Sequence, residues 1–174
     1  MRRFLLSCAI LAVLAVPAAA AARASASAKP GYVVVRNAFS DGGVNGSPVV
    51  TVVVRGFVLG RVSQEAEVEI YHLPSASGQG GPLVKGADVS HVHVRWHDLP
   101  GTRYSGSNFR FRGTGGFYRV VVRGSGVYVF AGGRGRVWLQ GSSANPRRDG
   151  VYSVNNGAFR SMPTKQLKRE IGRG

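Results

Sequence analysis

The chain has 174 residues, of which 23 are Lys or Arg and only 8 are Asp or Glu, so its formal net charge at pH 7 is +15. Hydrophobic residues make up 44% of the chain, which is enough apolar material for one folded domain of ordinary size. A single cysteine excludes a scaffold stapled by internal disulfides. The excess of positive charge favours polyanions or acidic surfaces as partners, although it also serves solubility.

The first element in the chain is a predicted signal peptide. A basic start, Met1-Arg2-Arg3, precedes an apolar run from Phe4 to Val16, and small residues follow; this order is typical of a secretory signal. We set the signal peptide at residues 1–24, with the cleavage bond between 20 and 28, and expect a secreted or cell-envelope protein. The apolar run of about 13 residues is too short to span a bilayer. Cys8 precedes most of that run, so lipidation at Cys8 is not expected.

After a short linker at residues 25–30, the chain has the period of strands. From residue 31 to 163, runs rich in β-branched and aromatic residues end at Gly, Pro, Asn or Ser, and no stretch has the period of an amphipathic helix. Residues 74–81 have the composition of a loop. Asn155-Asn156-Gly157 favours a tight hairpin turn, because Asn and Gly tolerate positive φ. The predicted strands cover residues 31–35, 49–54, 65–71, 91–96, 108–112, 117–123, 127–131, 136–140, 150–154 and 158–162.

Glycine clusters recur between Gly113 and Gly141 at intervals of about nine or ten residues. Such a cluster either closes a hairpin in an antiparallel meander or turns the corner of a coil in a β-solenoid. Because residues 31–106 lack the repeat, we predict an all-β domain over residues 31–163: a single antiparallel β-sandwich or flattened barrel of about ten short strands. A β-solenoid-like stack is the alternative. Residues 164–174 are predicted to form a basic tail.

Segments rich in Gly, Arg and Val resemble a group of small exported bacterial proteins. The similarity covers about residues 56–163 and includes Tyr104–Gly106, Phe109–Arg112, Gly116–Val120 and Gly150–Val154. That group has no assigned activity. The resemblance implies a secreted all-β protein and supplies no catalytic residue.

Arginines at alternate positions form the first candidate site. In Phe109-Arg110-Phe111-Arg112, strand alternation sends both phenylalanines to one face and both arginines to the other. If the arginine-bearing strands are neighbours, their side chains form a ladder that could hold the phosphate or carboxylate groups of an anionic wall polymer or polysaccharide. The alternative is a solvated sheet face whose arginines pair with the glutamates at 65, 67 and 69. The candidate binding residues are Arg110, Arg112, Arg119, Arg123, Arg136 and Trp138.

His91, His93 and His97 form the second candidate site, for a metal. They have the same strand parity, and imidazoles suit Zn, Cu or Fe. The run from Gly86 to Gly101 resembles the first metal motif of cupins, which also carries His-x-His on a strand, but it lacks the glutamate of that motif. His97 also lies too far from His91 along a straight strand to share one ion unless the strand bends.

Together these observations favour a noncatalytic function, with no catalytic residue and no cofactor. We expect a secreted or cell-envelope β domain that contacts anionic polymers through an arginine-rich sheet face. One alternative is a metal-dependent, cupin-like β-barrel enzyme that uses His91 and His93. Another is a structural or assembly protein in which an exposed edge strand pairs with a second chain. Nucleic acid is not expected as a partner, because no recognition module is visible.

Overall fold

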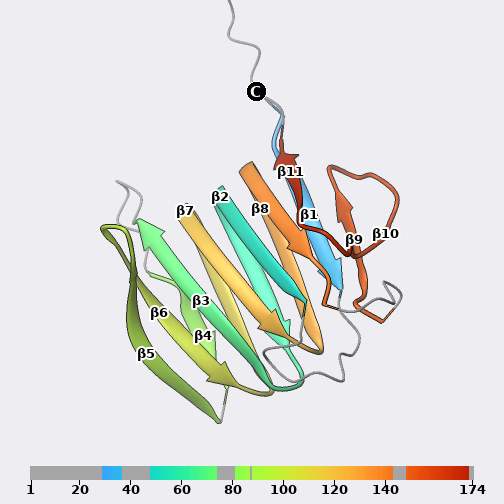
Figure 1. The fold of residues 1–174 in the computed structure, drawn as a ribbon. Coiled ribbons are helices and arrows are strands. Elements are labelled where there is room, and N and C mark those ends of the chain that lie inside the picture. The colour runs from blue at the N-terminus through green and yellow to red at the C-terminus, as the bar shows by residue number, and fades with distance from the viewer. Residues whose placement is uncertain (1–28, 37–47, 74–80, 87, 143–147, 173–174) are drawn as a thin grey trace, which may run out of the picture.

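The computed structural model describes residues 29–36, 48–73, 81–86, 88–142 and 148–172. The predicted signal peptide, residues 25–28 of the predicted linker and residues 74–80 of the predicted loop lie outside them. The described residues form one open antiparallel sheet (Figure 1), with no helix, so the prediction of an all-β antiparallel fold is confirmed. Its strands are β1 (Gly31–Arg36), β2 (Val49–Val62), β3 (Ala66–Leu73), β4 (Leu83–Lys85), β5 (Val89–Trp96), β6 (Leu99–Gly106), β7 (Phe109–Gly124), β8 (Val127–Gln140), β9 (Val151–Val154), β10 (Arg160–Ser161) and β11 (Leu167–Ile171).

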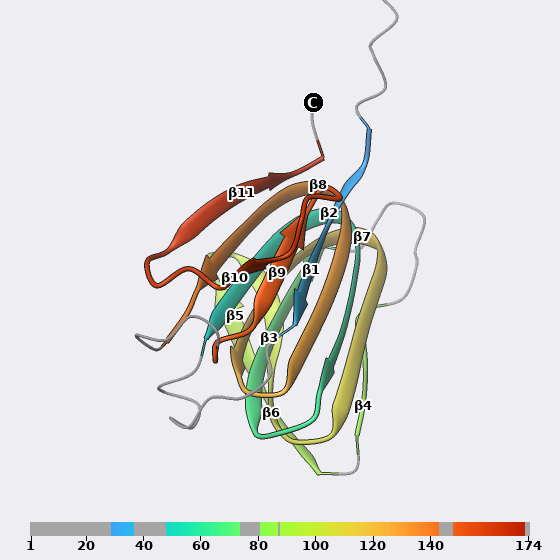
Figure 2. The same ribbon diagram turned by 90° about the vertical axis from the view of Figure 1, so that its right-hand side faces the viewer.

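Three long strands give the sheet its shape. β2, β7 and β8 have 14, 16 and 14 residues, and β2 lies between the other two along its whole length. Midway along, Gly56 pairs with Gly116 on one side and Gly133 on the other, and the register shifts between Gly56 and Phe57. Figure 2 shows the three strands arching at this level. The sheet therefore folds over at the middle of these three strands. The prediction of short strands is wrong for them, because each one runs through both halves of the folded sheet.

The arch depends on glycine. Gly133 has φ +133°, and a Cβ at this position would overlap the carbonyl oxygen of Arg55 on the neighbouring strand. A non-glycine residue would therefore be both strained and obstructed. Glycines in the middle of β2, β7 and β8 allow the backbones to approach closely while the strands bend.

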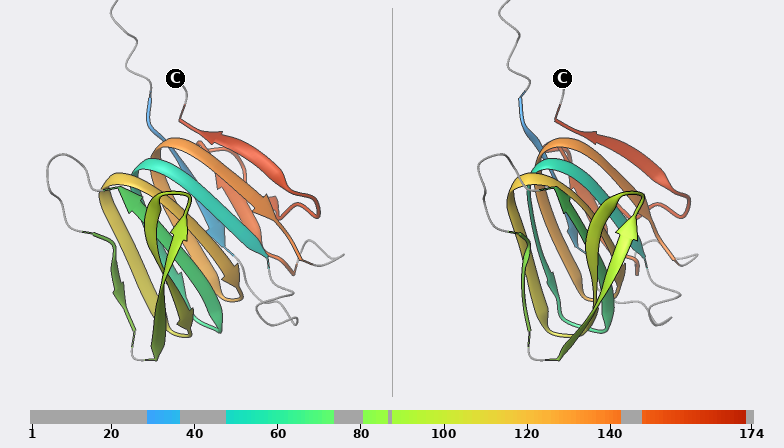
Figure 3. Two further views of the ribbon diagram at one scale, coloured as in Figure 1. Left: turned by 60° about the vertical axis from the view of Figure 1, so that its left-hand side comes forward. Right: turned by 90° about the vertical axis from the view of Figure 1, so that its left-hand side faces the viewer.

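The folded sheet has two layers, which Figure 3 shows as two legs below the arches. The first layer contains Val49–Arg55 of β2, with the second halves of β7 and β8; β3, β6 and β5 extend it on one side and β11 on the other. The second layer contains Phe57–Val62 of β2, with the first halves of β7 and β8; β4 extends it on one side and β1, β9 and β10 on the other.

Short connections cross between the layers at the end opposite the arches, among them those that join β2 to β3, β6 to β7 and β7 to β8. Between the first and the last of these, the backbone N–H and the hydroxyl of Ser63 both donate to the carbonyl of Gly126 at 3.0 Å. The glycine clusters therefore turn corners between layers, whereas a meander would use each of them to close a hairpin. All strand pairs within the described residues are nonetheless antiparallel, unlike those of a stack of parallel coils.

The core lies between the layers and follows the predicted alternation. Val52 and Val54 of the first layer and Val58 and Phe109 of the second layer are fully buried in one cluster. Phe111 also points inward, while Arg110 and Arg112 are exposed on the outer face. Burial of this apolar surface on folding stabilises the domain without any disulfide.

Two local predictions near the C-terminal end have different outcomes. The tight turn is confirmed, because Asn155 and Asn156 both have positive φ and Gly157 N–H donates to Val154 O at 3.0 Å. The separate basic tail is wrong, because residues 167–171 form β11, which pairs with β8. Ile171 is 1% exposed, so its burial fixes this segment to the domain.

Candidate anion-binding site

The fold divides the predicted arginine ladder between two outer faces. Arg119, Arg123, Arg136 and Trp138 lie on the outer face of the first layer, while Arg110 and Arg112 lie on that of the second layer. The arch lies between residues 112 and 119 of β7, so the six predicted residues do not form one surface. The two faces differ in whether their predicted arginines form ion pairs or ring contacts with other side chains of the described residues.

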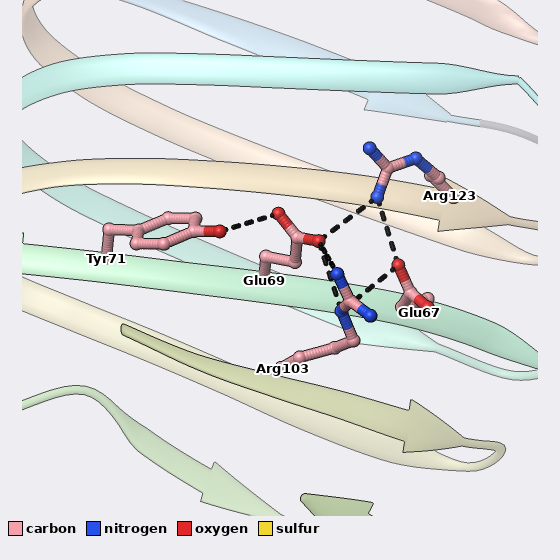
Figure 4. A network of polar contacts seen from close by, with 5 residues as sticks. All are labelled: Glu67, Glu69, Tyr71, Arg103 and Arg123. Atoms are coloured by element: carbon pink, nitrogen blue, oxygen red, sulfur yellow. Dashed lines mark hydrogen bonds and ion pairs between the residues drawn. The ribbon is translucent and has the colours of Figure 1, made fainter. Parts of the chain in front are cut away.

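On the first layer, arginines are neutralised by glutamates of β3 (Figure 4). Arg103 donates to Glu69 Oε1 from Nε at 3.1 Å and from Nη2 at 2.7 Å. Arg123 Nη1 lies 3.0 Å from Glu67 Oε1 and 3.4 Å from Glu69 Oε1. The Tyr71 hydroxyl donates to Glu69 Oε2 at 2.9 Å. Two arginines and two carboxylates thus balance each other, as the solvated-face interpretation predicted for Glu67 and Glu69.

The charge state of Glu69 follows from this network. Burial of the carboxyl, which is 6% exposed, would raise its pKa. The hydrogen bonds from Arg103 and Tyr71 and the positive charges of Arg123 and Arg103 outweigh burial, so the pKa of Glu69 is below its ordinary value. The pKa of Tyr71 is raised, by burial first and by its hydrogen bond to the Glu69 carboxylate second. Glu69 is therefore an ionised, structural carboxylate.

The other predicted residues of the first layer also have partners within the fold. The Arg119 guanidinium lies 4.5 Å from the ring centre of Trp96 and 5.1 Å from that of Tyr71, a pair of cation–π contacts. Arg136 Nε donates to Glu170 Oε1 at 3.0 Å. Lys168 Nζ lies 6.0 Å from the ring centre of Trp138. The predicted arginines of this face are therefore held by acids and aromatic rings of the same face.

On the second layer, cations lie directly opposite one another across neighbouring strands. Lys85 of β4 pairs with Arg110 of β7, and Arg110 pairs with Arg61 of β2. Tyr128 of β8 continues the line beside Arg61, and Arg36 of β1 follows with its guanidinium 5.9 Å from the Tyr128 ring centre. We call these five residues the cation row.

No acidic side chain of the described residues neutralises the cation row. Lys85, Arg61 and Arg110 form neither a hydrogen bond nor an ion pair with another side chain there, whereas Arg103, Arg123 and Arg136 do. Like charges directly opposite each other on paired strands destabilise a sheet. An anion placed on the row would remove this repulsion and gain charge-assisted hydrogen bonds.

A groove of about 650 Å³ lies along the row, a volume within the usual range of ligand sites. Its cationic lining consists of Arg61, Lys85, Arg110 and Arg112. Its apolar and aromatic lining side chains are Leu59, Leu83 and Tyr128, and Gly60 and Phe111, whose side chain points into the core, complete it. Among the described residues, no acidic one lines the groove, so it suits an anion with an apolar portion.

The three predicted metal ligands do not converge. His91 and His93 are exposed on the edge strand β5, with ring centres 6.4 Å apart. His97 lies beyond the end of β5, in the turn to β6, with φ +51°, which breaks the strand parity that the prediction assumed. Within the described ranges, which include all four histidines, no group of three or more His, Cys, Asp or Glu side chains could hold a metal ion.

Four residues of the cation row were not among the predicted site residues: Arg36, Arg61, Lys85 and Tyr128. The predicted strand 49–54 stopped short of Arg61, although Val58, Gly60 and Val62 continue its inward alternation. Lys85 lies on a strand of three residues, too short for a periodic signal. Arg36 lies just past the predicted strand 31–35 and becomes relevant only because β1 pairs with β8.

The described residues thus define an all-β domain with a cationic groove on one outer face. Among them, no helix is long and apolar enough to cross a membrane. In comparisons with protein-family models, curated proteins and solved structures, nothing matches this chain.

Proposed function

We propose that the protein is an exported, noncatalytic β domain of the cell envelope or the extracellular space that binds anionic polymers at the cation row. Export is inferred from the signal peptide at residues 1–24. The ligand class is inferred from Lys85, Arg61 and Arg110, which have no acidic partner among the described residues. Arg110 and Arg112 belong to the predicted binding residues, while Arg61, Lys85, Arg36 and Tyr128 extend the site beyond them.

One observation carries this proposal: Lys85, Arg110 and Arg61 oppose one another on three adjacent strands without an acidic partner among the described residues. Paired strands lie about 4.8 Å apart, so the row presents positive charges at short, regular intervals across the sheet. A polymer with repeated phosphate or carboxylate groups could lie across the strands and contact several cations at once. Tyr128 within the row offers a ring on which a sugar could stack.

Retention on an immobilised polyanion tests the proposal. The purified protein should bind polyphosphate or polygalacturonate beads at low salt and elute as sodium chloride is raised, because salt screens exposed charges. Arg110→Gln should shift elution to lower salt. Arg136→Gln removes one arginine from the other face and is the matched control, with the same change in net charge. Equal elution of both variants would contradict the assignment of the site.

Export has its own test. The protein recovered from the medium or envelope of a producing bacterium should have lost a segment that ends between residues 20 and 28, as measured by its intact mass. Recovery of the protein only from the cytoplasm, with Met1 to Val16 still attached, would contradict this part of the proposal.

An assembly role is a second candidate function, and the edge strand β5 favours it. β5 pairs only with β6, so its other edge offers unpaired backbone groups within the described structure, and Val92 on it is 62% exposed. Such an edge can pair with a second chain. Sedimentation should then show oligomers that grow with concentration and are lost in Val92→Lys.

A further inference from the structure

The groove beside the cation row has an apolar side that a hydrated polymer would leave uncovered. One register step of two residues from the row, Leu83 of β4 and Leu59 of β2 flank Arg112 of β7, and Phe130 of β8 follows Leu59. Leu83 is 40% exposed. The ring of Phe130 also contacts that of Phe57, with ring centres 5.2 Å apart. We call Leu83, Leu59, Phe130 and Phe57 the apolar strip.

The apolar strip and the cation row run side by side across the same outer face. Leu83, Leu59 and Phe130 therefore lie two residues along their strands from the row, about 7 Å, and Arg112 lies between the two leucines. On the first layer, by contrast, Arg103, Arg123 and Arg136 pair with Glu67, Glu69 and Glu170. An exposed leucine is common, but leucines that line a concave groove next to cations without an acidic partner among the described residues match a ligand with both properties.

We propose that the groove binds an anionic amphiphile, with its phosphate or carboxylate on the cation row and its aliphatic chain against Leu59 and Leu83, which lie on either side of Arg112. This inference rests on the proposed function and specifies its ligand: an anionic envelope component that carries an aliphatic chain. The cations supply charge-assisted contacts to the head group. The concave shape, with a volume of about 650 Å³, suits one molecule rather than the flat surface of a bilayer.

Chain length is the property that separates an amphiphile from a simple anion. Each methylene that leaves water raises the affinity by about fourfold. Butyl phosphate and octyl phosphate carry the same head group and differ by four methylenes. If the open groove removes half of that added surface from water, octyl phosphate should bind about 15-fold more tightly than butyl phosphate.

The experiment measures the affinity of the full chain for both alkyl phosphates, below the concentration at which octyl phosphate forms micelles. Leu83→Ser should reduce the ratio of the two affinities severalfold. Leu73→Ser is the matched control, since Leu73 is also exposed, at 52%, but lies on the first layer. Its ratio should equal that of the unmodified protein. Decanoate compared with butyrate extends the test to a carboxylate head group.

Each outcome decides a different part. Equal affinity for butyl and octyl phosphate, with polyphosphate retention still dependent on Arg110, would overturn the amphiphile inference and leave the proposed function in place. Binding only to anionic vesicles, and not to dispersed octyl phosphate, would also overturn it and indicate a membrane surface. If neither polyphosphate nor the alkyl phosphates bind in a way that depends on Arg110, the proposed function itself is overturned.

Discussion

Replacing Arg110 by glutamine should make the protein more stable and a weaker anion binder. Arg110 occupies the centre of the cation row, directly opposite Lys85 on one side and Arg61 on the other. It is exposed and forms no ion pair with a described residue. Its charge therefore repels two neighbours in the folded protein, and glutamine removes that repulsion while keeping part of the side-chain stem.

The size of the effect follows from the two opposed pairs. Like charges directly opposite on paired strands cost roughly 0.2–1 kcal/mol each, so relief of both should raise the free energy of unfolding by about 0.4–2 kcal/mol. For a chain of this size, that corresponds to an increase in Tm of roughly 1–8 °C. The gain should be largest near 0.01 M salt, where the Debye length is about 30 Å, and should nearly vanish near 1 M, where it is about 3 Å.

Urea unfolding at both salt concentrations, with chloride as the anion, measures the effect. Arg136→Gln is the control: it breaks the exposed ion pair with Glu170 and should lower stability by about 0–1 kcal/mol. Adding polyphosphate should raise the Tm of the unmodified protein more than that of Arg110→Gln, because a ligand stabilises the state that binds it. If Arg110→Gln is less stable than the parent at low salt, the repulsion argument is refuted.

Three other substitutions test the fold and its charges. The pKa of Glu69 is lowered in the folded protein, so the stability that Glu69 contributes is present above its unfolded pKa of about 4.5 and is lost as pH falls through its folded pKa. In Glu69→Gln, the free energy of unfolding measured in urea should therefore fall less steeply as the pH is lowered. The same steepness in both proteins would contradict this. Ile171→Ala should cost about 2–5 kcal/mol in chemical unfolding because Ile171 is fully buried, whereas the exposed Lys165→Ala should be neutral; equal effects would indicate a loose tail. Gly133→Ala should prevent the arch from forming, since its Cβ would overlap Arg55, and circular dichroism showing a native, cooperatively melting protein would count against this role.

A zinc titration addresses the cupin-like alternative. In the described structure, His91, His93 and His97 do not converge with another ligand. Stoichiometric zinc should therefore leave the Tm of the protein unchanged, and likewise that of His93→Ala. A zinc-dependent rise that His93→Ala abolishes would favour the metal-dependent enzyme.

The outward direction of Arg110 and Arg112 could be predicted from sequence, because successive side chains of a strand point to opposite faces whatever lies beside it. The same local rule placed Phe109 and Phe111 in the core. It also gave the direction of Arg119 and Arg136 correctly. What failed was the assumption that segments 108–112 and 117–123 are separate strands of one surface: they are the two halves of β7 and lie in different layers.

The amino-acid sequence alone determined that this protein is all-β and which of its side chains point outward, since both depend on the local alternation of residues such as Phe109 and Arg110. Only the tertiary structure decided which cations have partners. Arg123 is neutralised by Glu67, 56 residues away in the chain, while Arg110 faces Arg61 and Lys85. The physical reason is that charge interactions depend on distance in space, and that distance is set by the register and the bend of strands far apart in sequence.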